Sequence, residues 1–160
     1  MPELIVLDQN IQPLLWRQLC QLQQCFIPPW SVGQLQQQLN NSKSLNLGLL
    51  ANGQLLGFAF YQLLFEQAEI LQIAIDPAQR RQGYAGKLLQ QSIAALLERD
   101  IEQLLLEVRA SNDSAIKLYL QFGFSLDGRR KSYYPSSETD NREDALLYTL
   151  SLSTVRDAQR

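Results

Sequence analysis

The chain has 160 residues, with no histidine and only two cysteines. Without an imidazole base, neither Cys20 nor Cys25 has the usual partner that makes a thiol nucleophilic. The same absence excludes the common zinc arrangements, which combine Cys and His ligands. Helical spacing would point the two cysteines to different faces of a predicted helix, which disfavours a disulfide between them. We therefore interpret both as packing residues and expect no metal site.

Long apolar runs and an excess of charge are also missing. No stretch reaches the roughly 18 apolar residues of a membrane span. The N-terminus lacks the basic start and the cleavage site of a signal peptide. We therefore expect a cytoplasmic protein that does not bind a membrane. A net charge of -2 and a pI near 5.1 argue against a dedicated nucleic-acid binder. The basic cluster at residues 129–131 is interpreted as a solvated loop.

Residues 1–160 are expected to form a single domain, because 46% hydrophobic residues suffice for one core but the length does not suit two. Apolar residues at helical spacing predict two helices before the sheet, the second one opened by the capping-box pair Ser31 and Gln34. Residues 45–65 are typical of a hairpin that turns at Asn52 and Gly53. The other predicted segments are strands at 69–75, 104–109 and 144–152, a helix at 113–122, a long polar loop at 128–142 and a frayed polar tail at 152–160.

The most informative segment is residues 69–87, where an apolar strand runs into a loop that opens a helix. A helix N-terminus carries unpaired backbone N–H groups and partial positive charge, so it attracts anions. The spacing fits neither the nucleoside-triphosphate loop nor the Rossmann fingerprint. At this point a plain basic surface loop is an open alternative to a pyrophosphate site. The small residues are Gly83, Ala85 and Gly86, and the basic residues are Arg80, Arg81 and Lys87.

A second motif follows at residues 104–123. Residues 104–109 are typical of a buried strand interrupted by one carboxylate, Glu107. Residues 110–114 offer caps for a helix that carries Tyr119 and ends at Gly123, a residue suited to a left-handed C-terminal turn. From these residues alone, Glu107 could equally be an edge-facing or ion-paired strand residue, and Tyr119 could be a core aromatic.

With this motif in place, the chain resembles the GCN5-related N-acetyltransferase (GNAT) superfamily. Its loop fits the family pattern of Gln/Arg, two residues, Gly, one residue, Gly/Ala. The resemblance narrows to the ribosomal-protein-alanine N-acetyltransferases (RimI type) through segments in the right order along nearly the whole chain. These are CFIPPWS at 25–31, IAIDPAQRRQGYAGKLL at 73–89, LEVRASNDSAIKLYLQFGF at 106–124, and RRKSYYP with REDAL between 129 and 146.

The resemblance implies an α/β (α+β) GNAT fold: a mixed, mostly antiparallel central sheet flanked by helices, with acetyl-CoA bound where the central strands splay apart. Acetyl-CoA is then the co-substrate, and no metal is needed. One departure concerns Gly86, which stands where relatives often have Arg, so a phosphate contact would be lost or would shift to Lys87. Carried over residue by residue, the acetyl-CoA contacts are Ile73, Ala74, Ile75, Arg81, Gln82, Gly83, Tyr84, Ala85, Gly86 and Asn112.

Transfer of an acetyl group to an amine needs the amine deprotonated and the departing thiolate protonated. The resemblance assigns the base to Glu107 and the acid to Tyr119, with direct attack in a ternary complex. A carboxylate among leucines is expected to be partly desolvated, which suits a base that acts directly or through a water. A phenol with a pKa of ~10 can protonate a thiolate with a pKa of ~8.5 only modestly uphill.

The acceptor is expected to be a protein α-amino group, because its pKa of about 7.7–8.0 suits a mild base better than that of lysine, ~10.4. The resemblance implies the N-terminal Ala of a small-subunit ribosomal protein, contacted by Trp30, Tyr133 and Tyr134. We expect a monomer and no direct nucleic-acid partner. A lysine or small-amine acetyltransferase and a non-catalytic acetyl-CoA-binding module remain alternatives. Acidic residues that could meet a basic acceptor peptide are Glu138, Asp140, Glu143 and Asp144.

Overall fold

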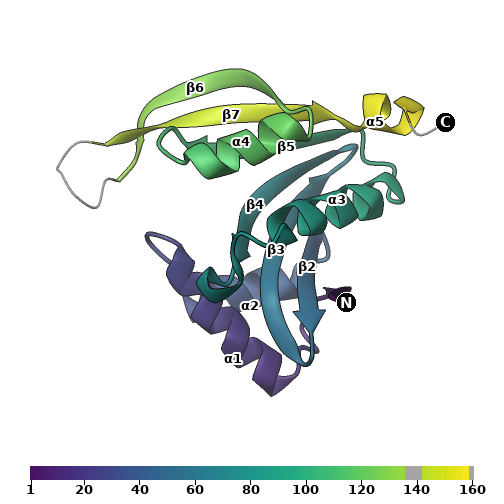
Figure 1. Cartoon of the computed structure of the whole chain (residues 1–160), viewed down its shortest axis with the longest axis vertical. Helices are drawn as coiled ribbons and strands as arrows, with labels where there is room; N and C mark the ends of the chain where they lie inside the picture. The colour runs from purple at the N-terminus through teal and green to yellow at the C-terminus, as the bar shows by residue number, and fades with distance from the viewer. Residues whose placement is uncertain (136–141, 159–160) are drawn as a thin grey trace.

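A seven-stranded sheet in the order β1-β2-β3-β4-β5-β7-β6 forms the centre of the protein (Figure 1). All neighbours are antiparallel except the parallel pair β4 and β5. The computed structural model describes residues 1–135 and 142–158, with the side chain of the last residue excepted. The strands are β1 (Glu3–Val6), β2 (Ser44–Ala51), β3 (Gln54–Leu64), β4 (Gln67–Ile75), β5 (Gln103–Arg109), β6 (Ser125–Tyr134) and β7 (Glu143–Ser151). The helices are α1 (Pro13–Leu22), α2 (Val32–Asn40), α3 (Tyr84–Leu97), α4 (Asp113–Gln121) and α5 (Leu152–Ala158), with 3-10 turns η1 (Gln23–Cys25) and η2 (Pro77–Gln79).

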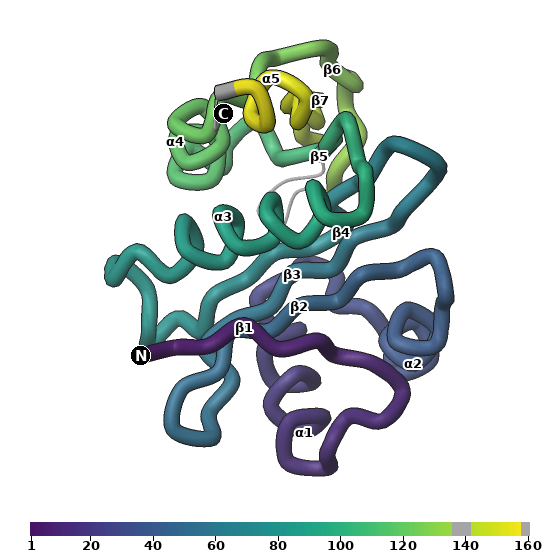
Figure 2. Tube along the Cα trace, turned by 90° about the vertical axis from the view of Figure 1, so that its right-hand side faces the viewer, coloured from purple at the N-terminus to yellow at the C-terminus, as the bar shows by residue number. Residues whose placement is uncertain are grey.

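The helices divide between the two faces of the sheet, and each face has its own apolar cluster. Helices α1 and α2 pack on one face, where Leu19 and Leu35 meet Phe58 and Phe60 of β3. On the opposite face, α3 and α4 cover a larger cluster that continues across β5 and β7. Figure 2 shows α3 and α1 on opposite sides of the strands. We call these the α1/α2 face and the α3/α4 face.

Local sequence signals account for several boundaries. The hairpin between β2 and β3 turns at Asn52 and Gly53, whose φ angles of 52° and 75° are those of a tight hairpin turn. At the start of α2, the Ser31 hydroxyl accepts a bond from the Gln34 N–H at 3.1 Å, and the Gln34 side chain accepts one from the Ser31 N–H at 2.8 Å. Gly123 takes φ 94° after α4. The predicted hairpin, capping box and helix end are therefore confirmed.

The central feature of the sheet is the point where β4 and β5 part (Figure 1). The parallel register pairs Gln67–Ile70 only with Gln103–Leu106, and the rest of each strand pairs with its outer neighbour alone. A bulge in β4 lies at the same point, since Phe60 of β3 is opposite Gln72 while the next residue, Tyr61, is opposite Ile70. A bulge bends its strand and increases the local twist. It therefore helps to turn β4 away from β5.

Two segment predictions were wrong. The polar loop predicted at 128–142 is instead strand β6 as far as Tyr134, held opposite β7. The tail predicted to fray from residue 152 is helix α5, because Leu152 is fully buried and the Arg156 guanidinium donates to the Leu97 carbonyl at 3.0 Å. Polar composition misled in both places, since β6 is an edge strand whose side chains are mostly exposed and α5 is a short helix with few buried residues.

Two expected absences can be checked against the part of the chain that the structure describes. Among residues 1–135 and 142–158, no helix is both long and apolar enough to span a membrane. The same residues contain no group of three or more Cys, Asp or Glu side chains placed to hold a metal ion. Cys20 and Cys25 are both free thiols.

Candidate functional site

The junction between β4 and α3 presents backbone N–H groups toward the end of the splayed strands. Gly83 is the residue before α3 and takes φ 81°, and no side chain caps the helix start. Arg81 also has a left-handed φ, of 65°. A Cβ atom placed on Gly83 would meet nothing within 4 Å, so the approach to the main chain is open. This open helix N-terminus fits the phosphate groups that the sequence motif predicts.

The charges around this junction differ from the prediction in one respect. Arg80 turns back onto the strand, where its Nε donates to the Ile75 carbonyl at 3.2 Å and Nη2 approaches the Cys25 sulfur at 3.7 Å. Its guanidinium therefore closes the end of β4 rather than facing the helix N-terminus. Arg81, which is exposed, and Lys87, which is half-buried, remain as the basic side chains beside that terminus.

Strand β4 supplies a free edge between the bulge and this junction. Ala74 is buried in the cluster of the α1/α2 face, whereas Ile73 and Ile75 pack toward the α3/α4 face. Beyond Ile70, the edge of β4 that faces β5 has no strand partner. Asn112, predicted to contact acetyl-CoA, is exposed at the start of α4, where its side chain accepts from the Ala115 N–H at 3.3 Å. It thus serves as a helix cap.

Glu107 is the first residue of β5 beyond the last β4–β5 pair. Its neighbours Leu106 and Val108 point into the core of the α3/α4 face. Alternation along the strand turns Glu107 to the α1/α2 face. There it forms an ion pair with Arg130 of β6, with Oε1 3.4 Å from Nη2, and its side chain is 21% exposed. The carboxylate is thus paired and reachable, instead of surrounded by leucines as the sequence suggested.

A second carboxylate, Glu69, lies on the same face. It is opposite Leu105 in the parallel register, and Leu105 and Glu107 share a face of β5. Burial raises the pKa of Glu69, the charge of Glu107 raises it further, and Arg130 lowers it. Glu69, Glu107 and Arg130 therefore form one electrostatic group at the mouth of the splay.

Tyr119 approaches the same region from α4. Its side chain is 5% exposed and its ring lies 5.5 Å from that of Phe124. Burial raises the pKa of Tyr119 to about 12, with a smaller contribution from Tyr134. The phenol therefore stays protonated at neutral pH. It is a weaker acid than the free phenol assumed from the sequence, so it suits a proton donor whose acceptor is also desolvated.

An irregularity in β6 sets the position of Tyr133 and Tyr134. Between Arg130 and Tyr134 the β6–β7 register shifts, and Ser132 takes φ 54°. The Ser132 N–H donates to Asp144 at 2.9 Å, which fixes this bulge. The tyrosine rings meet edge to face at 5.0 Å. Burial, followed by Glu107 and Tyr133, raises the pKa of Tyr134 to about 12, while Arg109 and Arg130 lower it.

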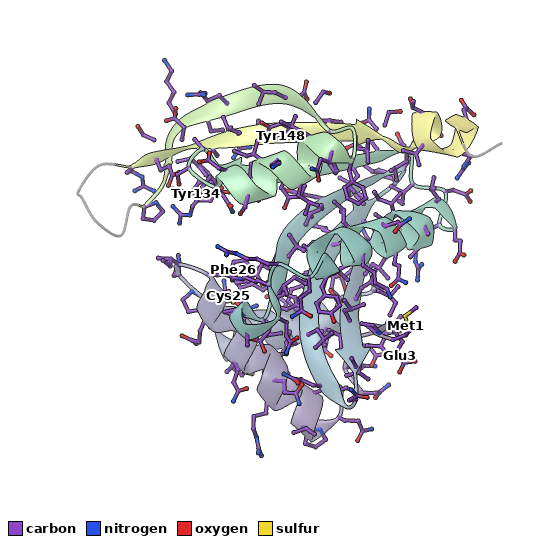
Figure 3. All side chains as sticks on the ribbon, in the orientation of Figure 1. Met1, Glu3, Cys25, Phe26, Tyr134 and Tyr148 are labelled. Carbon is purple, nitrogen blue, oxygen red and sulfur yellow. The ribbon has the colours of Figure 1, made fainter. Side chains whose placement is uncertain are left out.

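The α1–α2 loop (residues 26–30) faces this pair from the other arm of the molecule. Figure 3 shows Phe26 on this loop and Tyr134 on the β6 side, on opposite sides of the same opening. Trp30 stacks on Phe60 at 5.6 Å, so its ring belongs to the core of the α1/α2 face. The Trp30 N–H donates to the Gln23 side chain at 3.0 Å, and Gln23 donates to the buried Gln72 of β4 at 2.6 Å.

The acidic residues expected to meet a basic peptide have other partners. Glu143 accepts from the Ser111 N–H at 2.6 Å and pairs with Arg109 at 3.5 Å, and these bonds lower its pKa. Asp144 accepts from the Ser132 N–H and from Arg129, which lowers its pKa as well. Both carboxylates are therefore already bound to backbone N–H groups and arginines of the protein itself. Glu138 and Asp140 lie outside the described residues.

Sequence reasoning missed part of the site. Arg130 belongs to the cluster interpreted as a solvated loop, and Glu69 was not singled out within the strand predicted at 69–75. Arg109, Gln23 and Gln72 were not singled out. The available signals were weak: an arginine within a run of three basic residues shortly before two tyrosines, and a glutamine within the apolar stretch of residues 70–75. Their roles depend on strands that meet only in the folded sheet.

Comparison with known proteins agrees with this geometry. The model of the acetyltransferase (GNAT) family matches residues 16–124. A ribosomal protein bS18-alanine N-acetyltransferase from Escherichia coli (strain K12) is 43% identical over 109 residues, which cover 68% of this chain and 72% of the relative. The enzyme of that name from Haemophilus ducreyi is 42% identical over 132 residues, covering 81% and 88%.

The fold comparison gives the same answer. The crystal structure of the ribosomal-protein-S18-alanine N-acetyltransferase from Escherichia coli superposes with a TM-score of 0.83 at 33% identity and covers 95% of this chain and 94% of that one. The predicted fold class and the resemblance found in the sequence are thus confirmed. Acetyl-CoA is the co-substrate of the family, and the open N-terminus of α3 fits it. The chain belongs to the GNAT family and is an acetyl-CoA-dependent N-acetyltransferase.

Proposed function

We propose that this enzyme acetylates the N-terminal alanine of a small-subunit ribosomal protein, the bS18 type named for its relatives. The identity of 42–43% to those relatives supports this acceptor. The observation that carries the proposal is the position of Glu107, which follows directly on the last β4–β5 pair and is reachable from the α1/α2 face. A carboxylate in that place can receive a proton from an amine that approaches between the two arms.

Glu107 takes the role of general base in this proposal, directly or through one water. Its ion pair with Arg130 holds the carboxylate on the acceptor side. Tyr119 holds the proton that the departing sulfur receives, since its raised pKa keeps the phenol protonated until then. Acetyl-CoA supplies the acetyl group as a thioester. Glu107 takes one proton from the α-ammonium group, and the neutral amine attacks the thioester carbon, so that the amide C–N bond forms and the C–S bond breaks. Tyr119 gives its proton to the departing sulfur, and the second proton lost by the nitrogen restores the phenol.

Binding of the two substrates divides between the two sides of the site. On the donor side, we propose main-chain contacts along β4 and at the start of α3. On the acceptor side, Tyr133 is 43% exposed and Tyr134 half-buried, so both rings are available to a peptide. Trp30 anchors the α1–α2 loop through its stacking on Phe60. The residues proposed to hold acetyl-CoA are Ile73, Ala74, Ile75, Arg81, Gln82, Gly83, Tyr84, Ala85, Gly86 and Asn112.

An α-amino acceptor is supported by the chemistry of the base. An α-ammonium group, with a pKa of about 7.7–8.0, loses its proton to a carboxylate far more readily than lysine, with ~10.4. We propose that the protein works in the cytoplasm as a monomeric single domain, where a ribosomal protein N-terminus is accessible. This assignment rests on the relatives' acceptor.

Mass spectrometry of acetyl-CoA reactions tests the function. The peptides are a basic peptide beginning with Ala, versions with other first residues, and a lysine-containing peptide blocked at its N-terminus. One acetyl group on the free α-amine of the Ala peptide, formed far more slowly by Glu107→Gln, is the expected result. Modification of the blocked peptide alone would show a lysine acetyltransferase, and binding of acetyl-CoA without any product would contradict the enzyme assignment for these acceptors.

A further inference from the structure

Arg109 is the last residue of β5, and its guanidinium connects segments that are far apart in the sequence. Nη2 donates to the Ile27 carbonyl of the α1–α2 loop at 2.9 Å. Nη1 donates to the Pro135 carbonyl after β6 at 2.9 Å and approaches Glu143 of β7 at 3.5 Å. The guanidinium carbon lies 4.5 Å from the centre of the Tyr134 ring. One side chain thus touches both segments that border the acceptor side.

These two segments belong to different arms of the molecule. The α1–α2 loop belongs to the arm that contains α1 and β4, and β6 belongs to the arm beyond the splay (Figures 1 and 3). Because β4 and β5 do not pair beyond Ile70 and Leu106, the strands themselves do not connect the arms there. The bond from Arg109 to Ile27 crosses this opening on the acceptor side.

We propose that Arg109 is a positioning residue for the acceptor peptide: it joins the α1–α2 loop to β6 and sets the width and orientation of the opening between them. The proposal rests on the proposed function only in assigning the acceptor side to a peptide. Arg109 forms no part of the proposed proton transfers. Its removal is therefore expected to weaken peptide binding much more than acetyl-CoA binding.

The chemistry of the contacts calls for arginine. A guanidinium is planar and presents several N–H groups in a fixed fork, so it can serve two carbonyl groups and an aromatic face at once. Lysine has a single ammonium centre on a flexible stem and cannot reach both carbonyl oxygens in the same geometry. The ion pair with Glu143 at 3.5 Å is the loosest of these contacts, which makes the two carbonyl bonds the distinguishing ones.

Other contacts hold the α1–α2 loop and the end of β6 separately, but they do not join the two segments. The far end of the α1–α2 loop is held by the bond from the Trp30 N–H to Gln23. The Ile27 side chain is 61% exposed, so burial does not hold the loop at that residue. The Arg142 side chain donates to the Ser132 and Tyr133 carbonyls of β6, and these bonds stay within one arm. Among residues 1–135 and 142–158, Arg109 is the only side chain that donates hydrogen bonds to both Ile27 and Pro135.

Steady-state kinetics of Arg109→Gln and Arg109→Lys test the proposal, with Arg129→Gln as the matched control. Arg129 lies on β6, pairs with Asp144 at 2.9 Å and is 54% exposed, but has no bond to the α1–α2 loop. We expect both Arg109 variants to raise the KM for the Ala peptide at least about tenfold, since a charge-assisted hydrogen bond contributes roughly 1.5–3 kcal/mol. The KM for acetyl-CoA should change less than about twofold.

A second measurement needs no acceptor at all. Amide hydrogen exchange of the free enzymes should become faster at Phe26, Ile27 and Trp30 and at residues 132–134 in both Arg109 variants, and should stay unchanged at Phe26, Ile27 and Trp30 in Arg129→Gln. Faster exchange at both segments with a raised peptide KM supports the proposal. A wild-type KM for the peptide in Arg109→Lys, or unchanged exchange at residues 26–30, overturns it. If wild type acetylates no N-terminal peptide, the proposed function fails, and the exchange result still decides whether Arg109 joins the two segments.

Discussion

The two sides of the site are built in different ways. On the proposed donor side, residues 73–86 form one continuous stretch that offers main-chain groups, with left-handed conformations at Arg81 and Gly83. The proposed acceptor side is built from side chains, joined by bonds between residues distant in sequence. Arg109 reaches Ile27 across 82 positions, and Gln23 reaches Gln72 across 49.

This difference matches what each side has to recognise. Phosphate and pantetheine groups are the same for every acetyl-CoA enzyme, and backbone N–H groups recognise them whatever the neighbouring side chains. Acceptors differ between enzymes, and side-chain networks can be changed one residue at a time. Ion pairs such as Glu107–Arg130 and Arg109–Glu143 occur on the acceptor side. The comparison predicts that substitutions on the two sides have separable kinetic effects.

The largest effect is expected at Glu107, where the sides meet. Glu107→Gln keeps the size of the side chain but removes the base, so kcat should fall by roughly 10²–10⁴-fold. Glu102→Gln is the matched control, because Glu102 is an exposed carboxylate just before the same strand. Assays of coenzyme A release at several pH values measure the fall in kcat. A kcat within about threefold of wild type in Glu107→Gln would exclude it as the base.

A smaller loss is expected for Tyr119→Phe. The ring keeps its packing against Phe124, but the proton for the departing sulfur is gone, so kcat should fall by about 10–100-fold while both KM values hold. Tyr148→Phe serves as the control, since Tyr148 is equally buried, at 5% exposure, on β7. Thermal unfolding of both variants separates a catalytic loss from a packing loss. Equal kcat values for the two would make Tyr119 a core residue only.

A substitution on the donor side tests whether the kinetic effects of the two sides are separable. Arg81→Gln should raise the KM for acetyl-CoA about fivefold, in line with ~1 kcal/mol for an exposed charge contact, and leave the KM for the peptide unchanged. Arg99→Gln is the control at the other end of α3, where its guanidinium donates to Ala95. The expected pattern is the reverse of that for Arg109. A shift of both KM values in Arg81→Gln would show that the two sides are coupled.

How much the sequence predicts follows the same division. Motifs made of neighbouring residues were read correctly as structure: the turn at Asn52 and Gly53, the Ser31 capping box and the helix that begins after Gly83. Each depends on local backbone preferences. The identity of the family also followed from such motifs.

Interactions between strands were not predictable in this way. The strand order β5-β7-β6 brings Arg130 next to Glu107, and the local sequence at residues 129–131 does not predict this contact. Arg80 was expected at the phosphates, but the carbonyl of Ile75 is a nearer partner once the chain turns. Strand β6 and helix α5 were hidden by polar composition, because pairing with β7 holds β6 and burial of Leu152 holds α5, and neither is visible in the local sequence.

The smallest effect concerns stability and pH, at Glu69. Because its pKa is raised in the folded protein by burial and by Glu107, the folded state holds this proton more tightly than the unfolded chain. The contribution to stability is therefore complete below the unfolded pKa of ~4.3 and declines as pH rises through the raised value. Glu69→Gln should raise the melting temperature at pH 7 but not at pH 4.

Glu143 provides the opposite case, which makes the test decisive. Hydrogen bonds from Ser111 and Arg109 lower its pKa, so its carboxylate stabilises the fold above the unfolded pKa and loses that effect as pH falls. Glu143→Gln should therefore lower the melting temperature at pH 7 and approach wild type near pH 3. Glu69 is crowded by the charge of Glu107, whereas Glu143 accepts hydrogen bonds from its neighbours, so the two substitutions should shift the melting temperature at pH 7 in opposite directions. A shift in the same direction for both variants would contradict these opposed environments.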